Sequence, residues 1–195
     1  MKRIAIFASG SGSNAEVMIR HFSASPLARV TLLLSNNPEA GALARAKNLG
    51  VETVVFDREL FHSSAMAGVL ASHGIDYIVL AGFLWLVPPA LVDAYRDRIV
   101  NIHPALLPAY GGKGMYGERV HRAVLANGEK ESGITIHKVN ELYDSGDMIA
   151  QYRLAVRPDD TPETLASRIH ALEHRYFPLV IEAEIIHTFK MEGLR

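Results

Sequence analysis

Residues 4–15 have the sequence Ile-Ala-Ile-Phe-Ala-Ser-Gly-Ser-Gly-Ser-Asn-Ala, and this stretch decides the fold class. Its apolar run over residues 4–8 is typical of a strand that is buried on both faces of a sheet. Glycine and serine follow the run directly, and a helical pattern over residues 14–22 begins where they end. A buried strand, a glycine-rich turn and a helix form the first half of a β-α-β unit.

The same alternation repeats along the first half of the chain. Further short apolar runs occupy residues 30–34, 51–56, 77–80 and 98–102, and helical spacings occupy residues 40–49, 60–73 and 89–95. Strands that alternate with helices predict right-handed crossovers between parallel strands. We therefore predict an α/β fold with a doubly wound, mostly parallel sheet and helices on both of its faces.

The pattern changes after residue 101, although no linker or repeat marks the change. A loop rich in proline and glycine comes first, followed by a helix near residues 118–126 and by strands near residues 134–139 and 149–156. Thr161 and Pro162 predict the start of a last helix that ends near His174, with a break or kink at Pro178. We interpret residues 1–195 as one domain with two lobes, residues 1–100 and residues 101–195.

The charge and residue counts exclude several classes of protein. The chain has 20 Lys and Arg against 21 Asp and Glu, a net charge of -1, so we expect neither nucleic acid nor a membrane as a partner. It has no cysteine, which excludes disulfides, thiolate zinc sites and cysteine nucleophiles. The apolar run at the N-terminus is too short for a signal peptide, and no run approaches the roughly 20 residues that span a bilayer. We expect a soluble, cytoplasmic protein.

The glycine loop over residues 9–15 favours a monophosphate ligand. It joins a strand to a helix, where free backbone N–H groups and the helix dipole attract an anion. A dinucleotide site would also need an acid at the end of the second strand, where the sequence is Ser35-Asn36-Asn37, and the triphosphate loop ending in Gly-Lys-Ser/Thr is absent. The alternative is that the glycines and serines only form a tight turn and a helix cap.

Two further segments carry candidate catalytic groups. Asn101 and His103 stand at the carboxyl end of a predicted buried strand, and their spacing of two directs both side chains to the same face. Asp144 and Asp147 lie in a predicted turn between the last two strands. On local evidence each also has a structural explanation, because histidine often forms structural hydrogen bonds and aspartate favours turns.

These motifs together resemble the folate-dependent phosphoribosylglycinamide formyltransferases, and the resemblance covers nearly the whole chain. The matching blocks, in the order and spacing of the family, are Ser9-Gly-Ser-Gly-Ser-Asn14, Ala81-Gly-Phe83, Asn101-Ile-His-Pro-Ala-Leu-Leu-Pro108, Gly133-Ile-Thr-Ile-His137 and Asp144-Ser-Gly146. The resemblance implies an enzyme of de novo purine biosynthesis that transfers the formyl group of 10-formyltetrahydrofolate to the amine of glycinamide ribonucleotide. The chemistry needs no metal, and we expect a monomer or a homodimer.

The resemblance also implies roles for the three candidate catalytic residues. Asn101 would donate a hydrogen bond to the oxyanion that forms at the formyl carbon, and His103 would stabilise it as a cation and help the proton reach the leaving nitrogen. Asp144 would orient His103 and raise the pKa of its imidazole. His137 would lie below the active site, whereas we interpret His121 and His174 as surface or helix-face residues.

The substrate sites follow from the same resemblance. Residues 1–100 would form the lobe that binds the substrate phosphate, through Gly12, Ser13 and Asn14, and residues 101–195 the catalytic and folate-binding lobe. His170 and Glu173 share one face of the last helix and would meet the substrate, with Glu173 at the ribose hydroxyls; the alternative is a pair of solvated polar groups. The backbone of residues 84–87 would bond to the edge of the pterin while their apolar side chains pack against its faces. The cofactor-binding residues would be Leu84, Trp85, Leu86, Val87 and Asn101.

The sequence departs from the family pattern in two places. Many members have arginine at the position of Trp85, although an indole could stack against the folate tail. The loop over residues 111–117 is longer and richer in glycine than usual, and we predict that it is a mobile lid.

Four alternatives to this interpretation remain open. Formyltransferases that act on initiator methionyl-tRNA or on nucleotide-sugar amines share the Asn-x-His-Pro-x-Leu-Leu-Pro block, but the tRNA enzymes carry an extra basic domain. A hydrolase that releases formate from the same carrier usually adds an N-terminal regulatory domain. A non-catalytic folate- or nucleotide-binding protein could also use this sheet.

Overall fold

The structure, a computed structural model, describes residues 1–192. These residues form a seven-stranded sheet with the strand order β3-β2-β1-β4-β5-β6-β7. The strands are β1 (Lys2–Phe7), β2 (Ala28–Ser35), β3 (Glu52–Val55), β4 (Tyr77–Leu80), β5 (Ile99–His103), β6 (Glu131–Lys138) and β7 (Met148–Ala155). The first five are parallel to one another, and β6 pairs antiparallel with both β5 and β7, so that β6 alone runs in the opposite direction. The predicted mostly parallel sheet is confirmed.

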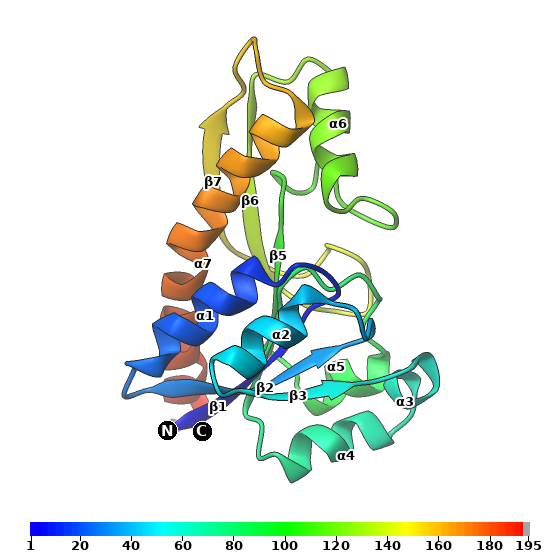
Figure 1. The fold of residues 1–195 in the computed structure, drawn as a ribbon, viewed down its shortest axis with the longest axis vertical. Coiled ribbons are helices and arrows are strands. Elements are labelled where there is room, and N and C mark those ends of the chain that lie inside the picture. The colour runs from blue at the N-terminus through cyan, green and yellow to red at the C-terminus, as the bar shows by residue number, and fades with distance from the viewer. Residues whose placement is uncertain (193–195) are drawn as a thin grey trace.

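Helices cover both faces of the sheet (Figure 1). One face packs against α1 (Ser13–Ser23), α2 (Gly41–Asn48), α6 (Glu118–Ala126) and α7 (Pro162–Glu192), and the other against α3 (Arg58–His62), α4 (Ala65–Ser72) and α5 (Pro89–Ala94). The alternation along β1 shows why, because Ile4 and Ile6 belong to the first core and Ala5 and Phe7 to the second. The doubly wound arrangement is therefore confirmed as well.

The single helix predicted over residues 60–73 is wrong. The structure has two short helices, α3 and α4, separated by Ser63 in an extended conformation with φ -90° and ψ 162°. The Ser63 hydroxyl donates to the carbonyl of Leu60 at 2.9 Å and accepts from the N–H of Ala65 at 3.2 Å. A serine side chain that bonds to its own backbone neighbours competes with helical hydrogen bonding.

The predicted end of the last helix near His174 is wrong, and so is a break of the helix at Pro178, because α7 continues from Pro162 to Glu192. Proline removes one helical hydrogen bond, a loss of about 3 kcal/mol in an exposed helix. Here Pro178 is buried, and its neighbours Phe177 and Ile181 are fully buried in the core against the sheet. Packing of this face outweighs the local penalty. The predicted start at Thr161 is confirmed, since its hydroxyl accepts from the N–H of Thr164 at 3.3 Å.

The change of strand direction at β5 positions the functional end of the sheet. β5 is parallel to β4, with Leu80 opposite Asn101, and antiparallel to β6, with Asn101 opposite His137. Because β1, β4 and β5 are parallel, the glycine loop after β1 and the end of β5 lie at the same edge.

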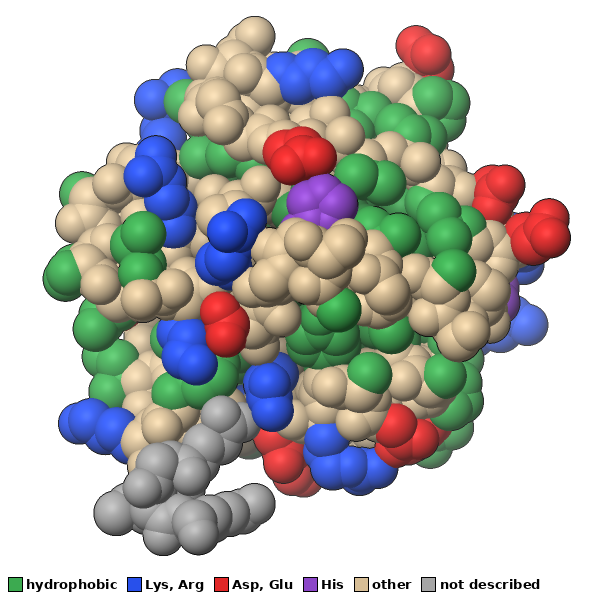
Figure 2. Space-filling model, turned by 90° about the horizontal axis from the view of Figure 1, so that it is seen from below, with side chains coloured by type: hydrophobic (Ala, Val, Ile, Leu, Met, Phe, Trp, Pro, Cys, Tyr) green, Lys and Arg blue, Asp and Glu red, His purple; other side chains and the backbone are tan. Residues whose placement is uncertain are grey.

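The surface carries no large area of one charge on the face that Figure 2 shows, where acidic and basic side chains are scattered among hydrophobic and uncharged ones. Within residues 1–192, no helix is both long enough and apolar enough to cross a membrane.

Gly12 is the point of closest approach between the glycine loop and α2. Its φ is 77°, and a Cβ built on it would lie 2.4 Å from the Cα of Ala42. Both the backbone conformation and the space therefore require glycine. At Gly10, two residues earlier, an added Cβ would meet no atom within 4 Å, and the backbone does not need a positive φ.

We predict that Gly12→Ala lowers the free energy of unfolding by about 2 kcal/mol, through the strained φ and the forced separation from α2. Urea unfolding followed by circular dichroism measures this change. Gly10→Ala is the matched control and should change the free energy by less than about 0.5 kcal/mol. Equal stabilities of the two variants would contradict the close contact of the loop with α2.

Candidate active site

Asn101 and His103 are brought together by β5, as their spacing predicts. His103 is almost completely buried, with 3% of its surface exposed, and Asn101 is half-buried. The strand ends immediately afterwards at Pro104, which lacks the N–H needed to continue the ladder. The two side chains thus lie on one face of the strand, at its carboxyl end.

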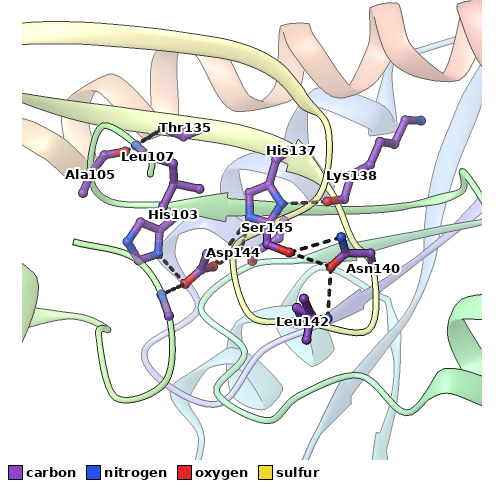
Figure 3. A network of polar contacts seen from close by, with 12 residues as sticks. His103, Ala105, Leu107, Thr135, His137, Lys138, Asn140, Leu142, Asp144 and Ser145 are labelled. Atoms are coloured by element: carbon purple, nitrogen blue, oxygen red, sulfur yellow. Dashed lines mark hydrogen bonds and ion pairs between the residues drawn. The ribbon is translucent and has the colours of Figure 1, made fainter. Parts of the chain in front are cut away.

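Asp144 lies between two histidines and holds this end of the sheet together (Figure 3). One carboxylate oxygen, Oδ2, is 3.5 Å from Nδ1 of His103 and accepts a hydrogen bond from the N–H of Gly112 at 2.9 Å. The other, Oδ1, is 3.6 Å from Nε2 of His137 and accepts from Nδ2 of Asn101 at 3.4 Å. The structure therefore brings Asn101, His103 and Asp144 into one cluster.

His137 occupies the predicted place next to these residues. Its Nδ1 lies 2.7 Å from the carbonyl of Lys138 and donates to it, and its Nε2 lies 3.1 Å from Nδ2 of Asn101. Asn101 and His137 are direct cross-strand partners on β5 and β6. Among residues 1–192 there is no group of three or more histidine, aspartate and glutamate side chains arranged to hold a metal ion.

The backbone of Tyr110 completes the surroundings of His103, and sequence reasoning missed it. Nε2 of His103 donates to the Tyr110 carbonyl at 2.7 Å, so both ring nitrogens face protein groups. Tyr110 has a φ of 58°, which is unusual for a residue with a side chain. A backbone carbonyl leaves no trace in the residue type. The sequence shows only a loop rich in proline and glycine at this place, and the position of the carbonyl follows from the structure.

The pKa directions in the cluster follow from burial and charge. Burial lowers the pKa of His103, and Asp144 and the Tyr110 carbonyl oppose this shift only in part. The expected raising effect of Asp144 is therefore present but outweighed. Burial alone would raise the pKa of Asp144, but His137, His103 and the N–H of Gly112 together hold it below its usual range. The cluster thus combines a carboxylate with a His103 that is less readily protonated than a free imidazole.

The glycine loop is fixed to its neighbours through Ser9. The Ser9 hydroxyl donates to Oδ1 of Asn36 at 2.7 Å and accepts from the N–H of Leu84 at 3.2 Å. The Ser9 carbonyl accepts from Nδ2 of Asn37 at 3.4 Å. Asn36 and Asn37, which stand where a dinucleotide site would have an acid, therefore hold the loop in place.

Glu173 joins the glycine loop to α7. It is 4% exposed, and its Oε2 accepts from Nδ2 of Asn14 at 2.8 Å and lies 2.8 Å from Nδ1 of His170. The hydrogen bond with Glu173 raises the pKa of His170. The alternative that this pair consists of solvated helix groups is wrong for Glu173. Oδ1 of Asn14 is buried without a hydrogen-bond partner among the described residues.

The predicted surface position of His121 is wrong. It is 2% exposed and belongs to the buried face of α6 together with Val120 and Val124. α6 packs against α7. The face of α6 that this contact buries is wide enough to include His121 beside Val120. Burial lowers the pKa of His121, with the charge of nearby His170 acting in the same direction. His174 is half-buried, and its Nε2 has no hydrogen-bond partner within residues 1–192.

A pocket opens beside the cluster. Its lining includes three of the predicted folate residues, Trp85, Leu86 and Val87, together with Asn101 and Asp144. Leu84 is not part of the lining and is 42% exposed, although its N–H is bonded to Ser9.

Trp85 is part of an aromatic cluster at this pocket. Its ring centroid is 6.0 Å from that of Phe56 and 5.7 Å from that of Phe61. The Arg58 guanidinium lies over the indole at 4.9 Å from its centroid. A cation therefore lies over the indole of Trp85.

Comparison with known proteins agrees with this geometry. The family model described as "Formyl transferase" matches residues 2–181. The chain belongs to this formyl transferase family. A chloroplastic phosphoribosylglycinamide formyltransferase of Arabidopsis thaliana is 43% identical over 93% of this chain, which spans only 65% of that relative.

Two bacterial relatives match over most of both chains. The phosphoribosylglycinamide formyltransferase of Bacillus subtilis is 36% identical, covering 93% of this chain and 94% of the relative. The crystal structure of glycinamide ribonucleotide transformylase 1 from Symbiobacterium toebii has a TM-score of 0.84 at 36% identity, covering 93% and 86% of the two chains. The formyltransferase fold predicted from the sequence is thus confirmed.

The contact between Asp144 and His103 leads to a testable prediction about the pKa of His103. We predict that Asp144→Asn lowers the pKa of His103 further, because the neutral amide no longer favours the imidazolium. NMR titration of the His103 ring, assigned by comparison with His103→Gln, measures the midpoint.

The matched control is Asp147→Asn, which removes the same charge from an exposed side chain of the same turn. It should leave the His103 midpoint nearly unchanged. An unchanged midpoint in Asp144→Asn would show that the carboxylate does not act on His103.

Proposed function

We propose that the protein transfers the formyl group of 10-formyltetrahydrofolate to the amine of glycinamide ribonucleotide. The products are formylglycinamide ribonucleotide and tetrahydrofolate, and the reaction belongs to de novo purine biosynthesis. The observation that carries the proposal is the cluster of Asn101, His103 and Asp144 at the edge of a pocket, in a chain of the formyl transferase family. The names of the relatives in Bacillus and Symbiobacterium support the substrate pair.

The glycinamide ribonucleotide site extends from the glycine loop to α7. Gly12, Ser13 and Asn14 stand at the N-terminus of α1, where the first N–H groups have no helical acceptor and the dipole favours a phosphate. Glu173 is bonded to Asn14, which fixes a carboxylate beside that phosphate site to accept from ribose hydroxyls. His170 holds Glu173 from the same helix.

The folate site is the pocket at residues 85–87. Apolar side chains can pack against the faces of a pterin, and the backbone can bond to its edge. Arg58, held over Trp85, provides a positive charge at this site, which supports the binding of an anionic folate tail.

The reaction follows from these positions. The amine nitrogen forms a bond to the formyl carbon, the carbonyl electrons move to oxygen, and the resulting oxyanion collapses as the bond to the folate nitrogen breaks. The proton lost by the attacking amine is transferred to the leaving nitrogen through His103. Asn101 donates to the oxyanion. Before that, the Nε2–H of His103 must exchange the Tyr110 carbonyl for the substrate.

We predict that Asn101→Ala and His103→Ala each reduce turnover about a hundredfold or more, because one donor to such an oxyanion contributes about 3 kcal/mol. The assay follows tetrahydrofolate release with glycinamide ribonucleotide, initiator methionyl-tRNA or an amino sugar nucleotide as acceptor. Only the first acceptor should be formylated. His187→Ala, at an exposed position of α7, is the control and should retain wild-type turnover.

Near-normal turnover of either variant would contradict the assigned roles, and formylation of another acceptor would contradict the substrate. Formate release without transfer would indicate a hydrolase instead. The cytoplasmic location, the two-lobe assignment, the lid role of residues 111–117 and the monomeric or dimeric state stay predictions.

A further inference from the structure

The carbonyl groups of the glycine loop are turned toward the protein and held there. Two of them are held by backbone donors: the Gly10 carbonyl accepts from the N–H of Ala42 at 3.1 Å, and the Gly12 carbonyl accepts from the N–H of Glu16 at 2.9 Å. No side chain is involved in these two contacts. They follow directly from the packing of α2 against the loop and from the first turn of α1.

The other two carbonyls depend on side chains. The Ser9 carbonyl receives a long hydrogen bond of 3.4 Å from Asn37. The Ser11 carbonyl receives a shorter one, at 3.0 Å, from Nε of Arg45 on α2. The Arg45–Ser11 contact is therefore the stronger of the side-chain contacts that orient the loop backbone.

The N–H groups of the same residues have the opposite environment. Within residues 1–192, the N–H groups of Gly10, Ser11 and Gly12 have no acceptor. Gly10 and Ser11 are exposed, so their N–H groups are open to a ligand, whereas Gly12 is buried against α2. A loop whose carbonyls are engaged and whose N–H groups are free is an anion-binding arrangement.

Arg45 is itself held in place by Glu16, the first acidic residue of α1. Its terminal nitrogen bonds to one carboxylate oxygen of Glu16, and Arg20 bonds to the other at 2.8 Å. These two guanidinium groups, Arg20 first, hold the pKa of Glu16 below its usual range. Arg45 is thus fixed beside the loop, whereas the side chain of Arg20 is 62% exposed and its charge is screened by solvent.

We propose that Arg45 is a positioning residue for the phosphate of the substrate. By holding the Ser11 carbonyl against α2, it keeps the loop N–H groups directed to the phosphate, and its charge favours the dianion. The inference rests on the proposed function, since it concerns the phosphate of that substrate. Arg45 differs from Arg20, which shares Glu16 but has no contact with the loop among the described residues.

The test compares Arg45→Met with Arg20→Met, both of which remove one cation from Glu16. Initial rates are measured with glycinamide ribonucleotide and with its dephosphorylated nucleoside. For Arg45→Met we expect a KM for the nucleotide about tenfold higher, with kcat within about twofold and the KM of the formyl donor unchanged. With the nucleoside the kcat/KM should match the wild type, and Arg20→Met should match it with both acceptors.

Arg45→Lys keeps the charge and one donor, and it should recover part of the affinity for the nucleotide. A second readout does not need turnover: ribose 5-phosphate is titrated into each protein, and the amide NMR shifts of Gly10 and Gly12 are followed. Arg45→Met should weaken this binding about tenfold, whereas Arg20→Met should leave it unchanged. Thermal unfolding of each variant shows that the fold is retained.

The two proposals fail in different ways. If the wild type formylates glycinamide ribonucleotide and Arg45→Met has the same KM as Arg20→Met, the role of Arg45 is overturned and the proposed function stands. An equal loss with nucleotide and nucleoside also overturns it, because the effect is then not on the phosphate. If the wild type does not formylate the nucleotide but binds ribose 5-phosphate in an Arg45-dependent way, only the proposed function falls.

Discussion

The carboxylate of Asp144, whose side chain is 11% exposed, is the constraint on which the active end of the sheet depends. A charge in a nearly dry environment is tolerated only when its oxygens are satisfied by donors or by opposite charge. Asp144 accepts hydrogen bonds from Asn101 on β5 and from the N–H of Gly112 in the loop after β5, and the rings of His103 and His137 lie within 3.6 Å of its two oxygens. Its partners come from three separate segments. The carboxylate therefore fixes two loops, its own between β6 and β7 and that of Gly112 after β5, relative to strands β5 and β6.

The order of strands explains why these segments can meet. β5 has a parallel neighbour on one side and an antiparallel neighbour on the other. The parallel side aligns its end with that of β1, where the glycine loop begins, and the antiparallel side sets His137 opposite Asn101. The hydrogen bond from Asn14 to Glu173 then closes the site across the two ends of the chain. In an all-parallel sheet, β6 would run the other way and would not place His137 opposite Asn101 in this antiparallel register.

Sequence patterns predicted what local and periodic signals determine, and tertiary packing determined the rest. The shared face of Asn101 and His103 follows from a period of two residues and is observed. Buried strands follow from continuous apolar runs, and the structure confirms them except at β3, an edge strand whose residues are half-buried or exposed. The continuation of α7 through Pro178 and the burial of His121 depend on which neighbours pack there, which no local pattern encodes. The lowered pKa of His103 has the same origin, because the charge of Asp144 is visible as a motif but the burial that outweighs it is not.

The lowered pKa of His103 fits a site that gains charge only during reaction. A permanently cationic imidazole would bind strongly to Asp144 and would be less free to exchange a proton. In the structure Nε2 of His103 donates to a neutral carbonyl, and Asn101 reaches Asp144 only at a long 3.4 Å, so both donors are held by partners that a developing oxyanion can replace. Negative charge on the substrate oxygen acts on the imidazole as Asp144 does and raises its pKa. The affinity of His103 for a proton therefore increases as the transition state forms, when the oxyanion needs a cation beside it.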